Sequence, residues 1–219
     1  MISSKFGIII QARTGSKRLP NKVFFKIGNK TLLDHIIKSL RKEKIDKNAI
    51  IATSKLKNDI KIVKWCKKSK VKFFSGNHLN VLDRFYRCAL KYKLKNIVRL
   101  TADNPFVDVK SIVHLLQFHE KNKFDYSSTL PILPKGVGTE VFTFAALKES
   151  YLNGKRKIDK EHVNEYILRN TKKFKTGIFK IKSNYNYNFS YSIDTIEDFE
   201  RISKNFKKNK FNFKKYRNY

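Results

Sequence analysis

The sequence predicts an α/β fold, in which a mostly parallel β-sheet is flanked by helices on both faces. From the N-terminus to about Lys121, short runs of β-branched and other apolar residues alternate with longer amphipathic stretches. Strand and helix alternating at this spacing indicate right-handed βαβ crossovers, which produce parallel strands covered by helices. Polar residues follow several of the apolar runs, as they do at the ligand-binding edge of an open parallel sheet.

The individual elements follow from this alternation. The apolar runs that predict parallel strands are Phe6–Ile10, Ala49–Thr53, Val71–Phe74 and Asn96–Leu100. The amphipathic stretches that predict helices are Leu32–Lys42, Ile60–Lys68, Val81–Tyr92 and Val109–Lys121. Asp108 directly precedes the last stretch and is placed to cap it, because an N-cap aspartate accepts a hydrogen bond from the first helical turn.

From about Asp125 the regular alternation of predicted strands and helices ends. The stretch DYSSTLPILPKGVGTEVFTF predicts a loop with mixed strands, followed by a helix near Lys160–Arg169 and a strand near Thr176–Ile181. The stretch YSIDTIEDFERISKNF then predicts a short strand that enters a last helix. We therefore expect one domain over residues 1–206, with an irregular region at 125–170 for the acceptor substrate or dimer contacts, and a basic tail at 207–219.

The composition is that of a folded protein with a substantial core, since 41% of the residues are hydrophobic and 13% are aromatic. No apolar run approaches the roughly 20 residues that span a bilayer, and the first residues lack the features of a signal peptide. Cys66 and Cys88 make no disulfide framework, and His114 and His119 are badly spaced for two ligands on one helix face. We expect a cytoplasmic protein with reduced thiols, no zinc site and no membrane segment.

The net charge of +31 admits two interpretations. Dense positive charge is typical of proteins that bind a polyanion such as nucleic acid, because Lys and Arg side chains that neutralise phosphates increase the affinity. Alternatively, the lysines are a compositional bias of solvated positions, since they are spread over nearly every polar helix face. Basic residues mixed with aromatic ones, as in a surface that stacks bases, occur only in the last 13 or so residues. We do not expect a nucleic-acid partner, although a basic nucleic-acid-binding protein stays an alternative.

The stretch IIIQARTGSKRLPNK is the first candidate site. It contains neither the Walker A pattern nor GxGxxG. Gly15 and Ser16 can nevertheless turn backbone N–H groups toward phosphate. Arg13, Arg18 and Lys22 would surround the same pocket with positive charge. The alternative is a basic surface loop that joins a strand to a helix.

The candidate metal ligands are Asp103 and Asp194. Asp103 follows a predicted strand, where its carboxylate would face the pocket, and Mg²⁺ commonly binds one or two carboxylates plus substrate phosphate. The alternative is a simple turn before Pro105. Asp194 follows the short apolar run of the predicted last strand. The alternative there is an N-cap, but Thr195 and Asp198 resemble a capping box and would cap that helix without it.

Four stretches, in this order, resemble the sugar cytidylyltransferases: IIIQARTGSKRLPNKV, TADNPFVD, EHVNEYI and SIDTIEDFE. That family includes CMP-Kdo synthetase and acylneuraminate cytidylyltransferase, and the branch most similar to this sequence is the one named after the spore-coat polysaccharide biosynthesis protein SpsF. The resemblance extends from Ile8 to about Ile202. Ala102 and Asn104 depart from the Gly and Cys that often flank the aspartate in this branch, which leaves the aspartate itself in place.

The resemblance implies a Rossmann-like sheet of the nucleotide-diphospho-sugar transferase type and transfer of CMP from CTP to a sugar, here an acidic one, with release of pyrophosphate. It also implies a homodimer and Mg²⁺ held by Asp103 and Asp194. The catalytic candidates are Arg13, Lys22 and Asp103. The nucleotide-binding candidates are Gln11, Ala12, Arg13, Gly15, Ser16, Arg18, Lys22, Thr53, Asp83 and Arg84. The sugar-binding candidates are Glu140, Glu161 and His162.

Several alternatives stay open at this point. Asp83 and Arg84 are adjacent on a predicted helix and cannot face each other, so a local salt bridge competes with a role in nucleotide binding. His162 is placed equally well for packing or capping. At the level of function, the alternatives are guanylyl or another nucleotidyl transfer on the same fold, the nucleic-acid-binding protein described above, and a catalytically inactive sugar-binding protein.

Overall fold

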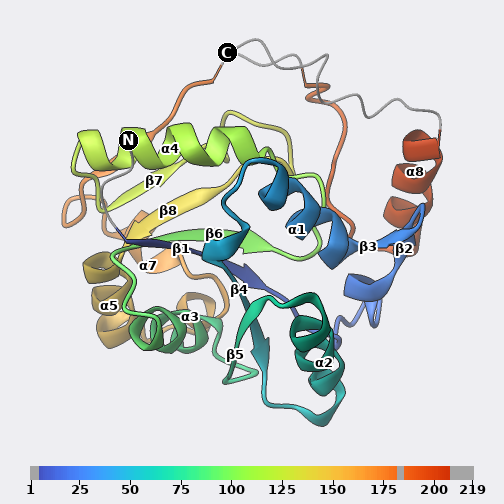
Figure 1. The fold of residues 1–219 in the computed structure, drawn as a ribbon. Helices are drawn as coiled ribbons and strands as arrows, with labels where there is room; N and C mark the ends of the chain where they lie inside the picture. Colours follow the sequence, from blue (N-terminus) through green and yellow to red (C-terminus); the bar gives the residue numbers. More distant parts are fainter. Residues whose placement is uncertain (1–4, 182–184, 208–219) are drawn as a thin grey trace.

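A seven-stranded sheet forms the centre of the computed structural model, which describes residues 5–181 and 185–207 (Figure 1). Four strands are mutually parallel and stand in the order β5-β4-β1-β6. Their bounds are β1 Phe6–Gln11, β4 Ala49–Ser54, β5 Lys72–Gly76 and β6 Asn96–Thr101. Because β4 and β6 flank β1 on opposite sides, the winding direction reverses at β1, where open α/β sheets bind their ligands.

The sheet continues beyond β6 with three shorter strands in the order β8-β7-β9. Their bounds are β7 Tyr126–Ser128, β8 Glu140–Thr143 and β9 Thr176–Ile178. Strand β8 runs antiparallel to both β6 and β7, whereas β9 is parallel to β7. This arrangement confirms the mixed strands expected after residue 125.

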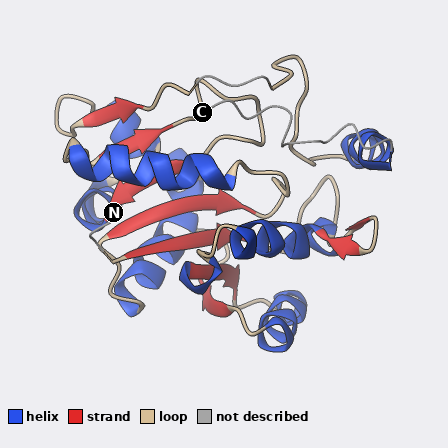
Figure 2. Cartoon of the chain, turned by 45° about the horizontal axis from the view of Figure 1, so that its top comes forward, coloured by secondary structure: helices blue, strands red, loops and turns tan. Residues whose placement is uncertain are grey.

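Helices cover both faces of the sheet, which gives three layers with a core on either side (Figures 1 and 2). One core contains Ile8, Ile10 and Ile51 of the sheet and is covered by helices α1, α2 and α4. The other contains Ile9 and Phe142 and is covered by α3, α5 and α7. The bounds are α1 Leu32–Lys42, α2 Ile60–Ser69, α3 Val81–Lys91, α4 Val109–Lys121, α5 Phe144–Asn153, α6 Lys157–Glu161 and α7 Glu165–Arg169.

A third, smaller cluster joins the end of the chain to its beginning. A hairpin of β2 (Lys26–Ile27) and β3 (Lys30–Thr31) packs near helix α8 (Ile196–Lys207). The shared apolar residues include Ile27 of the hairpin and Ile202 of the helix, both fully buried. This contact brings the segment just before α8 beside the loop that follows β1.

The four predicted parallel strands and their four helices are confirmed, with bounds that shift by one or two residues. Asp108 caps α4 as expected, since its Oδ1 accepts from Ser111 N at 3.4 Å. The single helix expected at 160–169 is instead the pair α6 and α7, and α5 was not predicted. All but the first residue of the basic tail predicted at 207–219 lies outside the described residues.

The prediction of a short strand before α8 is wrong, because residues 190–195 are described and form no strand. Ile193 N instead donates to Asp103 O at 2.9 Å, a single bond that fastens this segment to the turn after β6. Asp194 therefore lies at the start of a helix rather than at the end of a strand.

Candidate active site at the carboxyl ends of the strands

The loop after β1 is fastened to the end of β4 by a buried carboxylate. Asp59 is 2% exposed and ends a short 3₁₀ helix (Lys57–Asp59) before α2. Its Oδ1 accepts from both the N–H and the hydroxyl of Thr14 at 2.7 Å, and its Oδ2 accepts from the hydroxyl of Ser54. Burial alone would raise the pKa of Asp59, but these hydrogen bonds outweigh it and lower the pKa. An ionised Asp59 thus fixes the base of the loop.

The middle of this loop points to solvent. Arg13, Gly15 and Arg18 are exposed, and Ser16 is half-buried with its hydroxyl accepting from Leu19 N at 3.4 Å. A Cβ added to Gly15 would meet no atom within 4 Å, so the backbone there is open to an approaching ligand. The arrangement suits an anion, because cationic side chains and the exposed backbone at Gly15 share one short segment.

Lys22 ends this loop and turns inward. It starts a 3₁₀ helix (Lys22–Phe24) after Asn21, whose φ of 58° lies in the left-handed region, and it is 8% exposed. Its Nζ donates to Asp103 Oδ2 at 3.0 Å, to Ile193 O at 2.8 Å and to Asp194 Oδ1 at 3.3 Å. Three segments far apart in the sequence therefore meet at one ammonium group.

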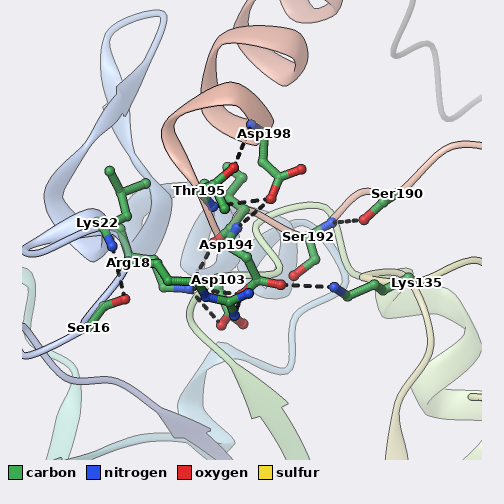
Figure 3. Close-up of polar contacts among 12 residues, drawn as sticks. Ser16, Arg18, Lys22, Asp103, Lys135, Ser190, Ser192, Asp194, Thr195 and Asp198 are labelled. Carbon is green, nitrogen blue, oxygen red and sulfur yellow. Dashed lines mark hydrogen bonds and ion pairs between the residues drawn. The ribbon is translucent and has the colours of Figure 1, made fainter.

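Asp194 collects further positive charge (Figure 3). Lys135, from the loop between β7 and β8, donates to its Oδ2 at 2.9 Å, and Arg18 pairs with its Oδ1 at 3.3 Å. Burial would raise the pKa of Asp194, but the hydrogen bond from Lys135 and the charge of Lys22 lower it on balance. Asp194 is thus held as a carboxylate at the centre of three cations.

The start of α8 is capped without the Asp194 carboxylate. Thr195 N donates to Asp198 Oδ2 at 3.1 Å, and Asp198 N donates to Thr195 Oγ1 at 3.3 Å. This reciprocal pair is the capping box that the sequence predicts. Because the helix needs no further cap, the carboxylate of Asp194 is free to act in the site.

The carboxylates of Asp103 and Asp194 fit a magnesium-type cation. Both lie next to Lys22 Nζ and both are partly accessible, with side-chain exposures of 27% and 15%. No group of three or more His, Cys, Asp or Glu side chains that could hold a metal occurs within residues 5–181 and 185–207. Two carboxylates suit Mg²⁺, which usually keeps several waters and takes its other oxygens from substrate phosphate.

A second set of polar groups lies where β1, β4 and β5 end. Arg84 of α3 is fully buried, and its Nη1 donates to Asn77 O at 2.7 Å. Among the residues that the structure describes, its Nε and Nη2 have no hydrogen-bond partner, and neither have Oε1 of Gln11 and Oγ1 of Thr53. Burial, with the nearby charge of Arg13, lowers the pKa of Arg84 to about 10. Such unpaired buried groups are costly unless a ligand completes them.

Local packing explains how Arg84 is accommodated. A Cβ added to Gly76 at the end of β5 would lie 3.0 Å from Arg84 Cγ, so the glycine makes room for the arginine. Its neighbour Asp83 faces another way and accepts from Arg87 Nε at 2.6 Å. Asp83 therefore forms the local salt bridge that the sequence left as an alternative.

The sugar-binding candidates are divided between two places. Glu140 of β8 is 2% exposed, pairs with Arg99 across the sheet, and its Oε1 accepts from the hydroxyl of Tyr126 at 2.7 Å. Burial, the charge of Glu140 and the hydrogen bond to it raise the pKa of Tyr126, which stays a neutral donor. A small open hollow adjoins this group and is lined by Arg99, Thr101, Asn104, Leu130, Thr139 and Glu140.

Glu161 and His162 are exposed at the C-terminal end of α6, a helix that packs against α3. Among the described residues, no hydrogen bond or ion pair joins either side chain to Lys22, Asp103 or Glu140. The structure therefore brings Glu140, but not Glu161 or His162, into contact with the polar groups at the end of β6.

Two residues of this site were not singled out from the sequence. Asp59 lies in TSKLKND, a polar stretch after the second predicted strand, which signals proximity to the site but no individual role. Lys135 lies in an irregular loop of a chain with 49 Lys and Arg residues, so nothing distinguishes it in the sequence. Its contact with Asp194 becomes apparent only from the packing.

Comparison with solved structures shows that the fold is that of known cytidylyltransferases. A cytidylyltransferase from Leptospira borgpetersenii serovar Hardjo-bovis superimposes with a TM-score of 0.88 at 28% identity, over 94% of this chain and 88% of the other. The CTP complex of CMP:2-keto-3-deoxy-manno-octonic acid synthetase superimposes with a TM-score of 0.72 at 15% identity, over 94% of this chain and all of the other (100%). At that identity the second match concerns the fold alone.

The chain belongs to the cytidylyltransferase family, whose model matches residues 7–216. An uncharacterized protein from Methanocaldococcus jannaschii is 41% identical over 193 residues, which cover 88% of this chain and 79% of that protein. The spore coat polysaccharide biosynthesis protein SpsF of Bacillus subtilis is 34% identical over 200 residues, covering 89% and 83%. The resemblance found in the sequence is thereby confirmed, and the protein is a nucleotidyltransferase by family. Within the part of the chain that the structure describes, no helix has the length and apolarity needed to cross a bilayer.

Proposed function

We propose that this protein transfers CMP from CTP to a sugar, with release of pyrophosphate, and that the acceptor is an acidic sugar used for a surface polysaccharide or glycan. The observation that carries the proposal is the meeting of Lys22, Asp103 and Asp194 at the edge of the sheet, beside the basic loop. The name of the SpsF relative supports a role in polysaccharide synthesis.

The reaction requires positioning and charge neutralisation more than covalent catalysis. A hydroxyl of the sugar attacks the α-phosphorus in line, and the bond from that phosphorus to the bridging oxygen of the pyrophosphate breaks. Arg13 and Arg18 are exposed on the loop and would bind the phosphates, Arg18 by leaving its present partner Asp194, while the open backbone at Gly15 lets the phosphates approach closely. Mg²⁺ held by Asp103 and Asp194 would supply further positive charge to the phosphate oxygens.

The unpaired groups beside β1 and β5 support cytosine as the base. Arg84 offers two free donors, and Gln11 offers a free acceptor. The Watson–Crick edge of cytosine carries acceptors at O2 and N3 and a donor at N4, so the two side chains match it in kind. Rejection of other bases then follows, because a mismatched base leaves the buried groups unpaired. Guanylyl transfer is the alternative that a base screen distinguishes.

Glu140 supports the acceptor pocket by orienting its neighbours. Both of its oxygens are engaged, by Arg99 and Tyr126, so it holds these two side chains in place. Asn104, Thr101 and Thr139 add polar groups to the lining of the pocket at the end of β6. These groups suit sugar hydroxyls, which both donate and accept hydrogen bonds.

Region 125–170 also supports a homodimer. Leu152 of α5, Ile158 of α6 and Leu168 of α7 are each between 44% and 47% exposed, although all are large apolar side chains, and α7 packs against both α5 and α6. Exposed apolar side chains gathered in one region favour contact with another chain. We expect light scattering to show a dimer, and the substitutions Leu152→Glu and Leu168→Glu to shift it toward monomer; a monomeric wild-type protein would contradict this part of the proposal.

The central experiment is a screen of pyrophosphate release. The four nucleoside triphosphates are tested with Mg²⁺ against a panel of acidic and neutral sugars. We expect turnover with CTP and an acidic sugar. Turnover with another nucleotide in place of CTP would replace cytidylyl transfer by that alternative. Turnover without a divalent cation would contradict the magnesium site.

Variants of the two carboxylates test the site itself. Asp103→Asn and Asp194→Asn should each lower turnover by about two orders of magnitude or more, and their combined effect should be far from multiplicative because they act as a unit. The matched control is Thr195→Ala, which removes a capping hydroxyl next to Asp194. It should cost about 1 kcal/mol of stability and change turnover by less than about twofold. A large loss of stability but not of turnover in Asp194→Asn would assign Asp194 to the helix end.

A further inference from the structure

The ammonium group of Lys22 stands between the two carboxylates. It lies 3.0 Å from an oxygen of Asp103 and 3.3 Å from an oxygen of Asp194 (Figure 3). Nζ also donates a hydrogen bond to Ile193 O at 2.8 Å, so all three of its N–H donors are used. Lys22 is 8% exposed, which makes it one of the few buried lysines in a strongly basic chain.

This position conflicts with a divalent cation at the same carboxylates. A cation bound to both oxygens would lie beside Nζ, since each of those oxygens is already within 3.3 Å of it. Two cations at such a distance repel strongly in a partly buried site, where solvent screens them little. The ammonium group and the metal ion cannot both occupy the space between Asp103 and Asp194.

We propose that Lys22 is a resident counter-ion which excludes free divalent cations from the carboxylates until nucleotide phosphates draw it away. The metal then enters together with the nucleotide rather than before it. This inference rests on the proposed magnesium site and adds an order of binding to it. Lys22 thereby contributes to the site in two states, as a substitute cation without the nucleotide and as a phosphate ligand with it.

The surroundings of Lys22 allow this exchange. It belongs to the same loop as Arg13 and Gly15, which face an incoming phosphate, and its four-carbon chain is flexible. When Nζ leaves, Asp194 keeps its contact with Lys135 at 2.9 Å. The arriving cation replaces the lost charge, so the carboxylates are neutralised in both states.

The test measures binding of Mn²⁺ alone, followed by the electron paramagnetic resonance of free Mn²⁺ in the absence of nucleotide. Mn²⁺ is used because it takes the same oxygen ligands as Mg²⁺ and is observable. Replacing the cation by a neutral side chain, in Lys22→Met, should tighten Mn²⁺ binding by about tenfold or more relative to wild type. Mn²⁺ should also raise the melting temperature of this variant more than that of wild type.

Three variants serve as controls. Lys135→Met removes a cation from the same Asp194, but its side chain is 67% exposed, so we expect a change of less than about threefold. Lys22→Gln keeps hydrogen-bond donors without the charge and carries the test if Lys22→Met does not fold. Adding Asp103→Asn to Lys22→Met should abolish the gain in Mn²⁺ affinity.

The outcomes separate this inference from the proposed function. If Lys22→Met and Lys22→Gln bind Mn²⁺ no better than wild type, while Asp103→Asn weakens binding, the metal and Lys22 coexist and the inference is wrong. If no variant binds Mn²⁺ and turnover with CTP needs no divalent cation, the magnesium site itself is wrong.

Discussion

A single buried carboxylate, Asp59, determines how the loop after β1 is held. Its carboxylate fixes Thr14, which stands between the exposed Arg13 and Gly15 in the chain. A second bond to β4 runs from Ala12 N to Ala52 O at 3.1 Å. Under the proposed function, Asp59 would therefore be a positioning residue whose effect on CTP passes through the loop.

Asp59→Ala tests this role. The substitution leaves the buried N–H of Thr14 without an acceptor, so we expect a loss of about 1–3 kcal/mol in the free energy of unfolding and a KM for CTP raised by about tenfold. Asp59→Asn should retain much of the wild-type stability and of the wild-type KM for CTP, because the amide oxygen still accepts a hydrogen bond from Thr14. The control is Asp46→Ala, which removes a surface pair with Arg41 and should change stability by less than about 1 kcal/mol and KM not at all. An unchanged KM in Asp59→Ala would make the residue purely structural.

Because the pKa of Asp59 is lowered in the folded protein, its contribution to the free energy of unfolding depends on pH. A carboxyl group whose pKa is lower in the folded than in the unfolded state stabilises the fold above its unfolded pKa. That stabilisation is lost as the pH falls through the folded pKa. The difference in stability between wild type and Asp59→Asn should therefore shrink below about pH 4, the ordinary range of an aspartate.

At the scale of elements, α4 and β7 are joined by a buried histidine. His119 is 1% exposed, its Nδ1 lies 2.9 Å from Ser127 Oγ, and its Nε2 has no hydrogen-bond partner within residues 5–181 and 185–207. Burial lowers its pKa to about 4, with the nearby charges of Glu120 and Asp125 opposing the shift only in part. The helix thus packs on the strand with the imidazole neutral.

His119 makes this contact sensitive to acid. Because the unfolded chain takes up the proton near pH 6.5 and the folded one near pH 4, stability should fall as the pH drops through that window, by on the order of 3 kcal/mol in all. His119→Gln keeps a hydrogen-bonding group for Ser127 without titrating, so its stability curve should be flatter between pH 6.5 and 4. Urea unfolding at several pH values measures both; parallel curves would show that His119 does not titrate there.

At the scale of the whole molecule, local sequence pattern was sufficient for the parallel half of the sheet. The runs at 49–53 and 96–100 are bounded by polar turns and followed by amphipathic stretches, so both the strands and their crossovers were predictable. The convergence of the loop after β1 with Asp103 followed from the rule that parallel strands end at one edge. The strand predicted just before Asp194 was wrong. The short apolar run there packs against the rest of the protein without joining the sheet.

The remaining features depend on contacts that sequence spacing does not encode. Strand β8 pairs antiparallel with β6 because a long loop returns it, and Arg99 opposite Glu140 fixes that register. Lys22 was predicted to hold phosphate, but its bonds to Asp103 and Asp194 span 81 and 172 residues. Nothing local distinguishes such a lysine from the others, so its place between the carboxylates required the tertiary structure.

The net charge of +31 raises the question whether nucleotide binding depends on the few cations at the site or on the positive charge of the whole molecule. Lys42, Lys68, Lys91 and Lys121 are exposed near the C-terminal ends of α1 to α4, away from the strand ends that carry the site. At physiological ionic strength the Debye length is about 8 Å, so exposed charges that lie farther than this from the site are largely screened. Changing all four to glutamine should leave kcat/KM for CTP within about twofold of wild type.

Lys135→Gln is the local counterpart of this variant. Because Lys135 contacts Asp194 directly, its loss should lower kcat/KM for CTP by more than the loss of the four remote lysines.

Raising the salt concentration should increase the KM for CTP severalfold through the exposed Arg13 and Arg18, with less change in kcat because Lys22 is buried. Retention on DNA at low salt should weaken in the fourfold variant, as expected of nonspecific attraction. A loss of about tenfold or more in kcat/KM from the four remote lysines would instead mean that the field of the whole molecule draws in the nucleotide.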